Sequence, residues 1–395
     1  MLAVPDTTPA RPPRRSGRLL VVALTVALLG AACSSPNRGA AAPPAASRSL
    51  NLKGVCPDPV VVQTSWYPQS EHGAVYQLLG SDSTIDAAHK KVTGPLVVHG
   101  RSTGVRIEIR AGGPAVGFQT AAALIYQDPS IALGMMNPDQ IIQLSKTQPV
   151  VGVVAPMELD PQIILWDPRQ HPDWHTIADI GQTNVKVLYF QGGTYMDYLL
   201  GSGILRKRQV DGSYDGSPSA FVASGGKIAV QGYATNEPYT YQHEIKAWGR
   251  PVAYQLVYDT GYPNYGNVLT VRSDHRAALA PCLRQLVPLI QQAQVEFVSS
   301  PAAAIGLILK LDTAYKGGFV YSRGNAQFAV DQMRHLGIVS NGADATLGNF
   351  DMARLARLIR IVAPIFSGQR KPIRANLGPG DVVTNEFIRS TIGLR

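Results

Sequence analysis

Aromatic and ionisable side chains are concentrated in one short stretch of the chain, TSWYPQSEHGAVY at 64–76, directly after an apolar run. It contains Trp66, Tyr67, His72 and Tyr76. His72 and Tyr76 are one turn apart on an expected helix and therefore face the same way. An aromatic wall beside an imidazole suits a flat, partly polar ligand that can be stacked and hydrogen-bonded. We predict that these four residues line a ligand pocket; the alternative is a loop whose aromatic rings cover the core.

Two pairs of glycines stand between an expected strand and an expected helix, Gly112-Gly113 and Gly192-Gly193, and Thr194 follows the second pair. Glycines at such positions let a ligand approach the backbone, and the N–H groups of a helix N-terminus are donors for it. We predict ligand-binding roles for Gly112, Gly113, Gly192 and Thr194. Taken singly, each glycine pair is equally compatible with an ordinary turn.

A second stretch with chemical potential is GYATNEPYTYQHEI at 232–245. Asn236, Glu237 and Tyr239 lie there after a short expected strand, in a turn fixed by a proline. A carboxylate and an amide beside an aromatic ring can recognise the donor edge of a heterocycle, so these three residues are predicted to bind the ligand. Tyrosine is dense over 233–265, and several of these rings are expected to pack between lobes or at a hinge instead.

Motifs of the common enzyme classes are absent from the sequence. There is no G-x-S-x-G nucleophile elbow, no H-E-x-x-H, no P-loop and no complete G-x-G-x-x-G. His171 and His175 are four residues apart, but Pro172 between them disrupts the helical face that a metal would need. We therefore predict no enzyme, no metal site and no cofactor, while a hydrolase with a Ser–His–Asp set outside these motifs stays open.

The N-terminal residues predict where the protein resides. A basic region with four arginines precedes the apolar stretch LLVVALTVALLGAA at 19–32, which is short for a membrane span, and LGAAC at 29–33 then resembles a bacterial lipobox. We expect cleavage before Cys33 and acylation of its thiol, which would hold the protein on the extracytoplasmic face of the cell membrane. The alternative is an ordinary secretory signal with Cys33 incidental.

The distribution of positive charge limits the classes of partner that the sequence supports. The formal net charge is +9, but the lysines and arginines are scattered apart from Arg354, Arg357 and Arg360 with RKPIR at 370–374. On a helix these three arginines oppose an apolar stripe, so a solvated face explains them; contact with acidic lipid or a partner is the alternative. Nucleic-acid binding is not supported.

Two further cysteines, Cys56 and Cys282, are separated by 226 residues without histidine companions. In an exported protein such a pair predicts a disulfide, which would attach the start of the folded body to a later helix. Two buried free thiols are the alternative.

Strands and helices alternate through the chain until about residue 275, after which the pattern is helical. This order predicts an α/β fold with a largely parallel sheet, and the length favours two lobes. The expected architecture is a two-lobed clamshell of the periplasmic-binding-protein type with a helical C-terminal portion. Its parts are a signal peptide at 1–32, a flexible tether at 33–55, the first part of lobe 1 at 56–150, lobe 2 at 151–258, and a return to lobe 1 with C-terminal helices at 259–395.

The pattern W-Y-P-x-x-E-H-x-x-x-Y, then GGP, NEPY and YGN before a strand, resembles the thiamine-pyrimidine-precursor-binding family of ABC-transporter solute-binding proteins. The resemblance spans about 57–315. It implies a type II clamshell with the ligand between the lobes, and binding roles for Trp66, His72, Gly112, Gly113, Asn236 and Glu237. Ser65 departs from the Asp that often precedes the tryptophan, which leaves the ligand open between a thiamine pyrimidine, riboflavin, a nitrate-like anion and a sulfonate.

The expected function is therefore capture of a small planar heterocycle outside the membrane and its delivery to an ABC permease. The alternative from another class is an anchored sensor or interaction lipoprotein of the same fold. A permease and an ATPase encoded beside this chain would favour the first function over the second.

Overall fold

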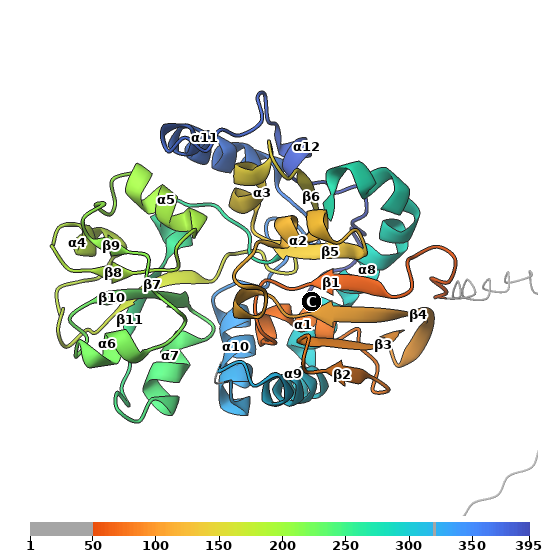
Figure 1. The fold of residues 1–395 in the computed structure, drawn as a ribbon, viewed down its shortest axis with the longest axis horizontal. Helices are drawn as coiled ribbons and strands as arrows, with labels where there is room; N and C mark the ends of the chain where they lie inside the picture. Colours follow the sequence, from red (N-terminus) through yellow and green to blue (C-terminus); the bar gives the residue numbers. More distant parts are fainter. Residues whose placement is uncertain (1–49, 319–320) are drawn as a thin grey trace, which may run out of the picture. The chain divides into compact units, whose positions relative to one another are not determined.

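A computed structural model describes residues 50–318 and 321–395 as two β-sheets with helices around them (Figure 1). The first sheet has the strand order β2-β3-β4-β1-β5-β12-β6, and the second has the order β11-β7-β10-β8-β9. The first sheet consists of β1 (Val60–Gln63), β2 (Thr84–Asp86), β3 (Lys91–Val98), β4 (Arg101–Arg110), β5 (Ile131–Met136), β6 (Val150–Val154) and β12 (Val268–Arg272). The second consists of β7 (Gln162–Trp166), β8 (Val187–Leu188), β9 (Val210–Asp211), β10 (Ala229–Tyr233) and β11 (Ala253–Leu256). We call the parts built on these sheets lobe 1 and lobe 2.

The α/β two-lobed prediction is confirmed, but the prediction of a largely parallel sheet is wrong. In lobe 1 only the pairings of β1 with β4 and β5 are parallel among the described strands. β3 and β4 form an antiparallel hairpin because His99 and Gly100 both have positive φ, the conformation that a tight two-residue hairpin turn requires. β12 returns from lobe 2 and enters antiparallel between β5 and β6. In lobe 2, β10 pairs antiparallel with β7 and parallel with β8, so both sheets are mixed.

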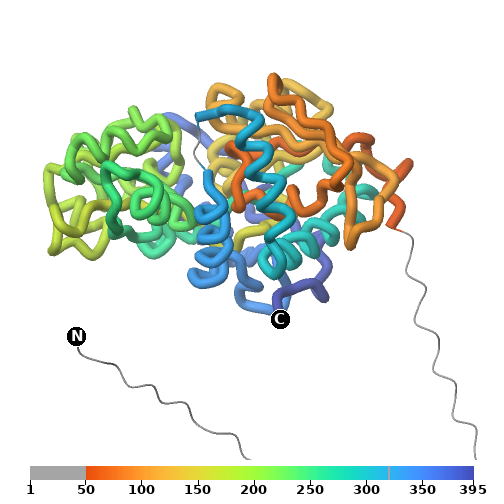
Figure 2. The backbone as a smooth tube through the Cα atoms, turned by 90° about the horizontal axis from the view of Figure 1, so that it is seen from below, coloured from red at the N-terminus to blue at the C-terminus, as the bar shows by residue number. Residues whose placement is uncertain are grey.

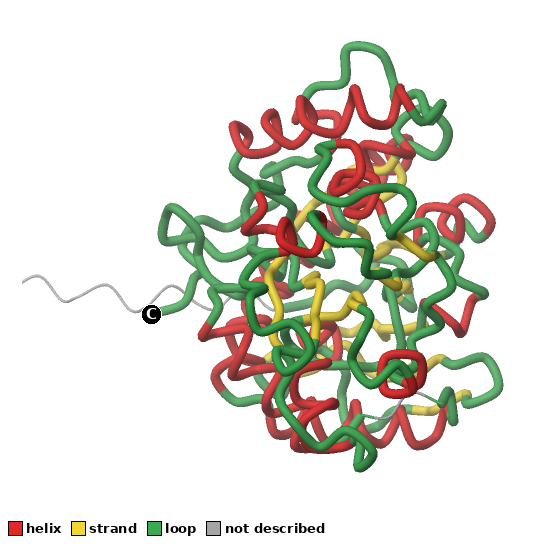
Figure 3. Tube along the Cα trace, turned by 90° about the vertical axis from the view of Figure 1, so that its left-hand side faces the viewer, coloured by secondary structure: helices red, strands yellow, loops and turns green. Residues whose placement is uncertain are grey.

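Helices cover both sheets, so that the strands lie inside and the helices outside (Figure 3). The short helices that precede β12 are α1 (Gly73–Tyr76), α2 (Ala121–Gln127), α3 (Pro138–Leu144), α4 (Ile177–Gly181), α5 (Thr194–Gly201), α6 (Ser219–Ala223) and α7 (Glu237–Tyr239). The C-terminal part has α8 (Arg276–Ser299), α9 (Ala302–Tyr315), α10 (Arg323–His335), α11 (Met352–Gly368) and α12 (Pro379–Val382). The helical C-terminal portion expected from the sequence is therefore present.

The start of the described chain is packed rather than tether-like. Leu52 is 1% exposed, and its backbone N–H donates to the carbonyl of Thr103 at 2.8 Å. The predicted disulfide is present: Cys56 and Cys282 are bonded, which joins this segment to α8. Packed structure thus begins before residue 56, inside the predicted tether. The predicted signal peptide and Cys33 lie outside the described residues.

Two chain segments cross between the lobes, one after β6 and one before β12, and the chain leaves the first sheet later than the predicted boundary at 150. α11 contacts both lobes: its Ile365 lies against Gly201 of α5, and Lys371, which follows α11, pairs with Asp197 of α5 at 2.9 Å. The helix also packs on α3 of lobe 1. Figure 2 shows lobe 2, drawn in yellow-green and green, at one side of the molecule. The C-terminal segment therefore bridges the two lobes.

The prediction that three arginines of α11 form one solvated face is wrong for Arg354, which is 4% exposed. Its guanidinium donates to the carbonyl oxygens of Pro263, Asn264 and Glu158 and pairs with the Glu158 carboxylate. Arg357 and Arg360 are exposed, as predicted. A buried guanidinium needs these acceptors because an unpaired buried charge is strongly destabilising.

Among residues 50–318 and 321–395, no single helix is long and apolar enough to span a membrane; α8 and α9 meet that test only as a pair, bent by 94°.

Candidate functional site

A cavity of about 300 Å³ lies between lobe 1 and lobe 2. Its walls include Ser65, Trp66, Phe118, Asn137 and Asp139 from lobe 1 and Phe190, Thr194, Tyr195, Tyr233 and Glu237 from lobe 2. Asp160, from the first crossover, and Asn267, from the second, complete the wall. The volume is at the lower end of the usual range for small-molecule sites. The cavity is therefore large enough for a small solute and needs both lobes to enclose it.

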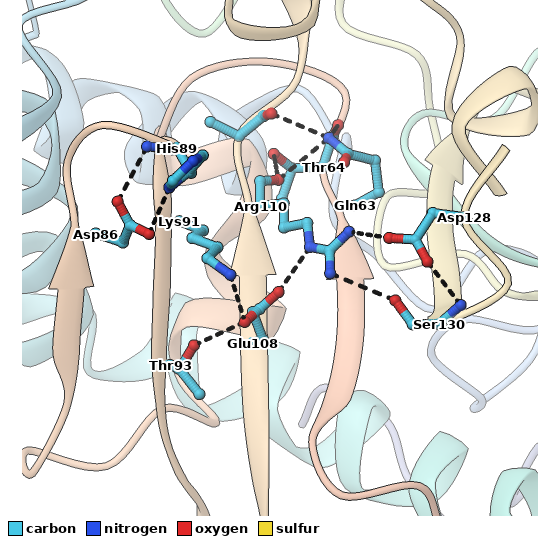
Figure 4. A network of polar contacts seen from close by, with 11 residues as sticks. Gln63, Thr64, Asp86, His89, Lys91, Thr93, Glu108, Arg110, Asp128 and Ser130 are labelled. Atoms are coloured by element: carbon cyan, nitrogen blue, oxygen red, sulfur yellow. Dashed lines mark hydrogen bonds and ion pairs between the residues drawn. The ribbon is translucent and has the colours of Figure 1, made fainter.

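Trp66 is held at the carboxyl end of β1 by a set of backbone and side-chain hydrogen bonds. Its carbonyl accepts from the Thr64 hydroxyl at 2.8 Å and from the Gly112 N–H at 3.0 Å. The Gln63 side-chain amide and the Thr64 backbone N–H donate to the carbonyl of Arg110, whose side chain is fixed by Glu108 and Asp128, each at 2.7 Å (Figure 4). The loop that carries Trp66 is thus anchored to the end of the sheet.

Gly112 and Gly113 allow the chain to pack closely around Trp66, and the N–H of Gly112 donates to the Trp66 carbonyl. A Cβ on Gly112 would stand 2.1 Å from the Thr64 carbonyl oxygen, and a Cβ on Gly113 would stand 2.4 Å from the Trp66 ring. Gly113 also has φ +59°, which favours glycine. Gly113 lines the cavity while Gly112 lies behind it. Close packing therefore explains both residues.

Two phenylalanines extend the aromatic surface of Trp66. Phe118 of lobe 1 lies 6.0 Å and Phe190 of lobe 2 lies 5.8 Å from the Trp66 ring, measured between ring centroids. The two phenylalanine rings are 4.5 Å apart, so they touch across the lobes. Phe118 is 45% exposed and is one of three exposed large apolar side chains among the described residues. The three rings form an aromatic cluster at one side of the cavity.

Phe118 occupies this place because the expected continuous helix after GGP is interrupted. A short 3₁₀ turn, η2 (Gly113–Val116), ends at Gly117, and Gly117 and Phe118 both have positive φ. α2 then starts separately, with the Thr120 hydroxyl accepting from the N–H of Ala123. The break turns the Phe118 ring toward Trp66.

His72 and Tyr76 do not line the cavity. The stretch predicted as one helix is a 3₁₀ turn, η1 (Ser70–His72), followed by α1, and it directs both side chains into the interior. The His72 Nε2 is 3.1 Å from the Ser65 hydroxyl, which donates to Asn267 Oδ1 at 2.8 Å. Burial lowers the pKa of His72 to about 3, so its imidazole is neutral. His72 therefore supports the cavity-lining Ser65 from behind.

Tyr67 and Tyr239, also predicted to bind the ligand, pack elsewhere. The ring of Tyr67 lies against the backbone of Gly317, where a Cβ would be 2.3 Å from it. The ring of Tyr239 contacts His243 and Phe328, and its hydroxyl lies against Gly324 of α10. Tyr239 follows Glu237 by two residues within one helical turn, so it points away from the side on which Glu237 meets the cavity.

Asp139 and Asp160 contribute buried carboxyl groups to the cavity wall. Asp139 accepts from the Thr194 hydroxyl at 2.5 Å and the Tyr262 hydroxyl at 2.8 Å, and thereby links α3 to α5 across the lobes. Asp160 accepts from the amides of Asn137 at 2.9 Å and Asn264 at 3.1 Å. Burial raises the pKa of Asp139, and burial with the nearby Asp139 raises the pKa of Asp160 to about 7.

Glu237 is the third carboxyl group in the wall. Its side chain lies over Gly232 of β10, and its Oε2 accepts from the backbone N–H of Tyr233. Burial raises the pKa of Glu237 to about 7. Asn236 also lines the cavity, and its Oδ1 accepts from the Asn325 amide of α10 at 2.7 Å.

Glu71, next to His72, makes a further contact between lobes behind the cavity. Its carboxyl accepts from the hydroxyl of Thr235, which follows β10. Burial raises the pKa of Glu71 to about 7. This hydrogen bond and the Asp139–Thr194 bond both require the lobes to be close together.

Of the eleven ligand-binding residues predicted from the sequence, the structure places six in the cavity wall, namely Trp66, Gly113, Gly192, Thr194, Asn236 and Glu237. Sequence reasoning missed Phe118, Phe190, Asp139, Asp160 and Asn267. Phe190 ends an expected strand immediately before the glycine pair, so its position at the carboxyl end of a strand was a usable signal. Asp139 and Asp160 each adjoin a proline at the boundary of an element, a weaker signal.

Among the described residues, no group of three or more His, Cys, Asp and Glu side chains has the geometry to hold a metal ion. His171 instead stacks on Trp174, with ring centroids 3.6 Å apart.

No protein-family model matches the chain, and no curated protein matches it. Among solved structures, it is similar to the periplasmic aliphatic sulphonate-binding protein SsuA from Escherichia coli, with 14% identity over 86% of this chain and 94% of that chain and a TM-score of 0.53. The alkanesulfonate-binding protein SsuA from Xanthomonas axonopodis, bound to MOPS, has 14% identity over 83% and 100% of the two chains and a TM-score of 0.51.

A ligand-binding component of an ABC-type import system from Staphylococcus aureus, with zinc bound, has 9% identity over 83% and 98% of the two chains and a TM-score of 0.50. At such identities these likenesses concern the fold. The chain therefore has the two-lobed α/β fold found in the periplasmic solute-binding proteins of ABC importers.

Proposed function

We propose that this chain captures a small planar heterocycle outside the membrane and delivers it to the permease of an ABC importer. The observation that carries the proposal is the cavity of about 300 Å³ between the lobes, in which an aromatic cluster and three carboxyl groups meet. Trp66 offers a face on which a flat ring can stack, and Glu237 can accept hydrogen bonds from its edge. A thiamine pyrimidine precursor has such a ring and edge.

Lobe closure is the mechanism by which the solute would be held. The Asp139–Thr194 and Glu71–Thr235 hydrogen bonds and the Phe118–Phe190 contact all join the lobes, so each would break on opening. A solute that touches both lobes binds the closed arrangement better and shifts the equilibrium toward it. Closure also creates the surface that a permease can distinguish from the open form.

We further propose that the N-terminal Cys33 is acylated and holds the protein on the extracytoplasmic face of the cell membrane. The proposal is based on the basic, apolar and small-residue order before Cys33. An anchored sensor would also be held by an acylated Cys33. Solute import differs from it because import requires a permease.

Mass spectrometry of small molecules released from the purified folded body tests the proposed function. We expect one planar heterocycle in near-stoichiometric amount. Release of riboflavin would replace the pyrimidine, whereas release of an alkanesulfonate would contradict the planar heterocycle; either would retain the solute-binding role. Protein that releases no small molecule, and that is not stabilised by planar heterocycles, would contradict the proposal.

A further inference from the structure

The acidic and basic side chains around the cavity are all carboxylic acids. Asp139, Asp160 and Glu237 line it, and none of the described lining residues is Lys, Arg or His. All three carboxyl groups are largely removed from solvent, and Asp139 and Asp160 are 1% and 5% exposed. Buried carboxylates without a positive partner are costly, and like charges in one site add to the cost. A positively charged solute would remove that cost.

We propose that the ligand is an aromatic cation with an amidinium-like N–H edge, and that the cavity excludes sulfonates and other anions. This inference rests on the proposed function and specifies the solute class of the same site. Asp139 and Asp160 each accept hydrogen bonds from three protein groups, whereas Oε2 of Glu237 accepts from the Tyr233 backbone. We therefore assign direct contact with the cation to Glu237. Asp139 and Asp160 compensate its positive charge from the cavity wall.

A second observation indicates that the ligand also has an acceptor. Asn267 is 2% exposed and lines the cavity, and its Nδ2 has no hydrogen-bond partner among the described residues. Its Oδ1 is already engaged by the Ser65 hydroxyl. Asn267 also has φ +45°, an uncommon conformation for a residue other than glycine. A ring nitrogen or carbonyl on the solute would satisfy this amide.

The groups that face the carboxyls from neighbouring elements are acidic or neutral. Asp160 interacts electrostatically with Asp139, Tyr195, Tyr233 and Tyr262, and Glu237 with Glu71, Tyr214, Tyr233 and Tyr241. Burial raises the pKa of each of these tyrosines, so their hydroxyls are neutral, and His72 behind Ser65 is neutral as well. With pKa values of about 7, Asp160 and Glu237 are each only partly ionised at pH 7, and a bound cation would displace the protons that they retain.

Three probes of similar shape and different charge test the proposal: benzamidinium, neutral benzamide and the anion benzenesulfonate. Calorimetry at pH 7 in two buffers of different ionisation enthalpy measures both affinity and proton transfer. We expect benzamidinium to bind at least about tenfold more tightly than benzamide, with release of up to about one proton, and benzenesulfonate not to bind.

Matched variants distinguish the effect of a carboxyl group that lines the cavity from that of a carboxyl group outside it. Glu237→Gln and Asp160→Asn are each expected to weaken benzamidinium binding at least about tenfold and to weaken binding of neutral benzamide by a smaller factor. Asp215→Asn is the control, because Asp215 is exposed and lies outside the set of residues that line the cavity. Its loss should change benzamidinium binding less than about twofold. Thermal unfolding of each variant checks that it is folded.

Two results would overturn the proposal while leaving the proposed function intact. One is binding of benzenesulfonate, lost in Trp66→Ala, in preference to benzamidinium. The other is binding of benzamide as tight as that of benzamidinium, without proton release. If none of the three probes bound, the proposal of a cationic ligand would also be rejected. The co-purified solute and its dependence on Trp66 would then still decide the proposed function separately.

Discussion

Arg354 and Glu158 form a buried ion pair that joins the C-terminal helix α11 to the first crossover between the lobes, with Nη1 and Oε1 2.6 Å apart. The same guanidinium donates to the carbonyls of Pro263 and Asn264 in the second crossover, at 3.0 and 2.8 Å. One side chain therefore contacts both segments about which the lobes would move. Its ring contacts reinforce this position, because the guanidinium carbon lies 3.7 Å from the centroid of Tyr265.

Replacement of Arg354 by Met is expected to reduce the free energy of unfolding by about 3–5 kcal/mol, because Glu158 and three carbonyls would lose a buried partner. Arg357→Met is the matched control: it lies one turn away on α11 and is exposed, so its effect should stay within about 0.5 kcal/mol. Urea unfolding of both variants measures the difference. Equal midpoints would show that Arg354 does not stabilise the crossover.

The contact between Phe118 and Phe190 should slow solute release. Phe118→Ala removes a ring that touches the other lobe, and an aromatic pair contributes about 0.5–1.5 kcal/mol beyond area burial. We expect the dissociation rate of the co-purified solute to rise about threefold to tenfold. Phe118→Leu keeps apolar volume and should show a smaller rise. Stopped-flow release that is unchanged in the Ala variant would remove this ring from the closure mechanism.

The raised pKa of Asp160 predicts how stability depends on pH. The folded protein has a pKa of about 7 at this carboxyl, against about 3.9 in an unfolded chain, so the folded state holds a proton that the unfolded state has lost. Stability therefore falls as pH rises from about 4 through 7. Between pH 6 and pH 8 the contribution of Asp160 should fall by about 1.4 kcal/mol.

Asp160→Asn lacks this proton, so its unfolding free energy should decline less than that of the parent over the same interval. His72 has the opposite effect on stability, at acidic pH. Burial lowers its pKa to about 3, so the stability that its neutral form contributes is lost as pH falls below about 6.5. Denaturant unfolding of the unliganded parent and variant at pH 6, 7 and 8 measures the difference. Parallel pH curves would mean that Asp160 does not titrate in this range.

Cys33→Ala should release the protein from the membrane or leave its precursor uncut. The reason is that the acylated thiol would be both the anchor and the residue at the cleavage site. Metabolic labelling with a fatty-acid analogue, followed by fractionation, measures the change. Cys56 and Cys282 serve as internal controls because they are joined in a disulfide. Equal labelling of the Ala variant would refute acylation at Cys33.

The sequence predicted the fold class because hydrophobic periodicity and element order are local signals. It did not predict strand direction: β12 lies antiparallel between β5 and β6 because of its distant return from lobe 2. Burial of Arg354 was missed for the same reason, since helical periodicity places it beside Arg357 and only the crossover segments supply its acceptors.

The candidate site was partly predicted where residues follow strands, although Phe190 was missed there, and it was missed where a turn sets the direction of a side chain. Trp66 and Glu237 lie in the cavity wall, as expected from their positions after β1 and β10. His72 was misplaced because a 3₁₀ turn replaced the first turn of the expected helix, and Phe118 was missed because the break at Gly117 interrupted another. Both outcomes depend on a few dihedral angles that residue types do not determine.

The measurement that tests the central claim most directly is calorimetric titration of the co-purified solute into the parent, Trp66→Ala and Tyr239→Phe. Trp66 forms part of the cavity wall, so its loss should weaken binding at least about tenfold. Tyr239 packs against α10 outside the wall, so its variant should bind within about twofold of the parent. If Trp66→Ala binds as tightly as the parent, the solute is held elsewhere and the interlobe cavity is not the binding site.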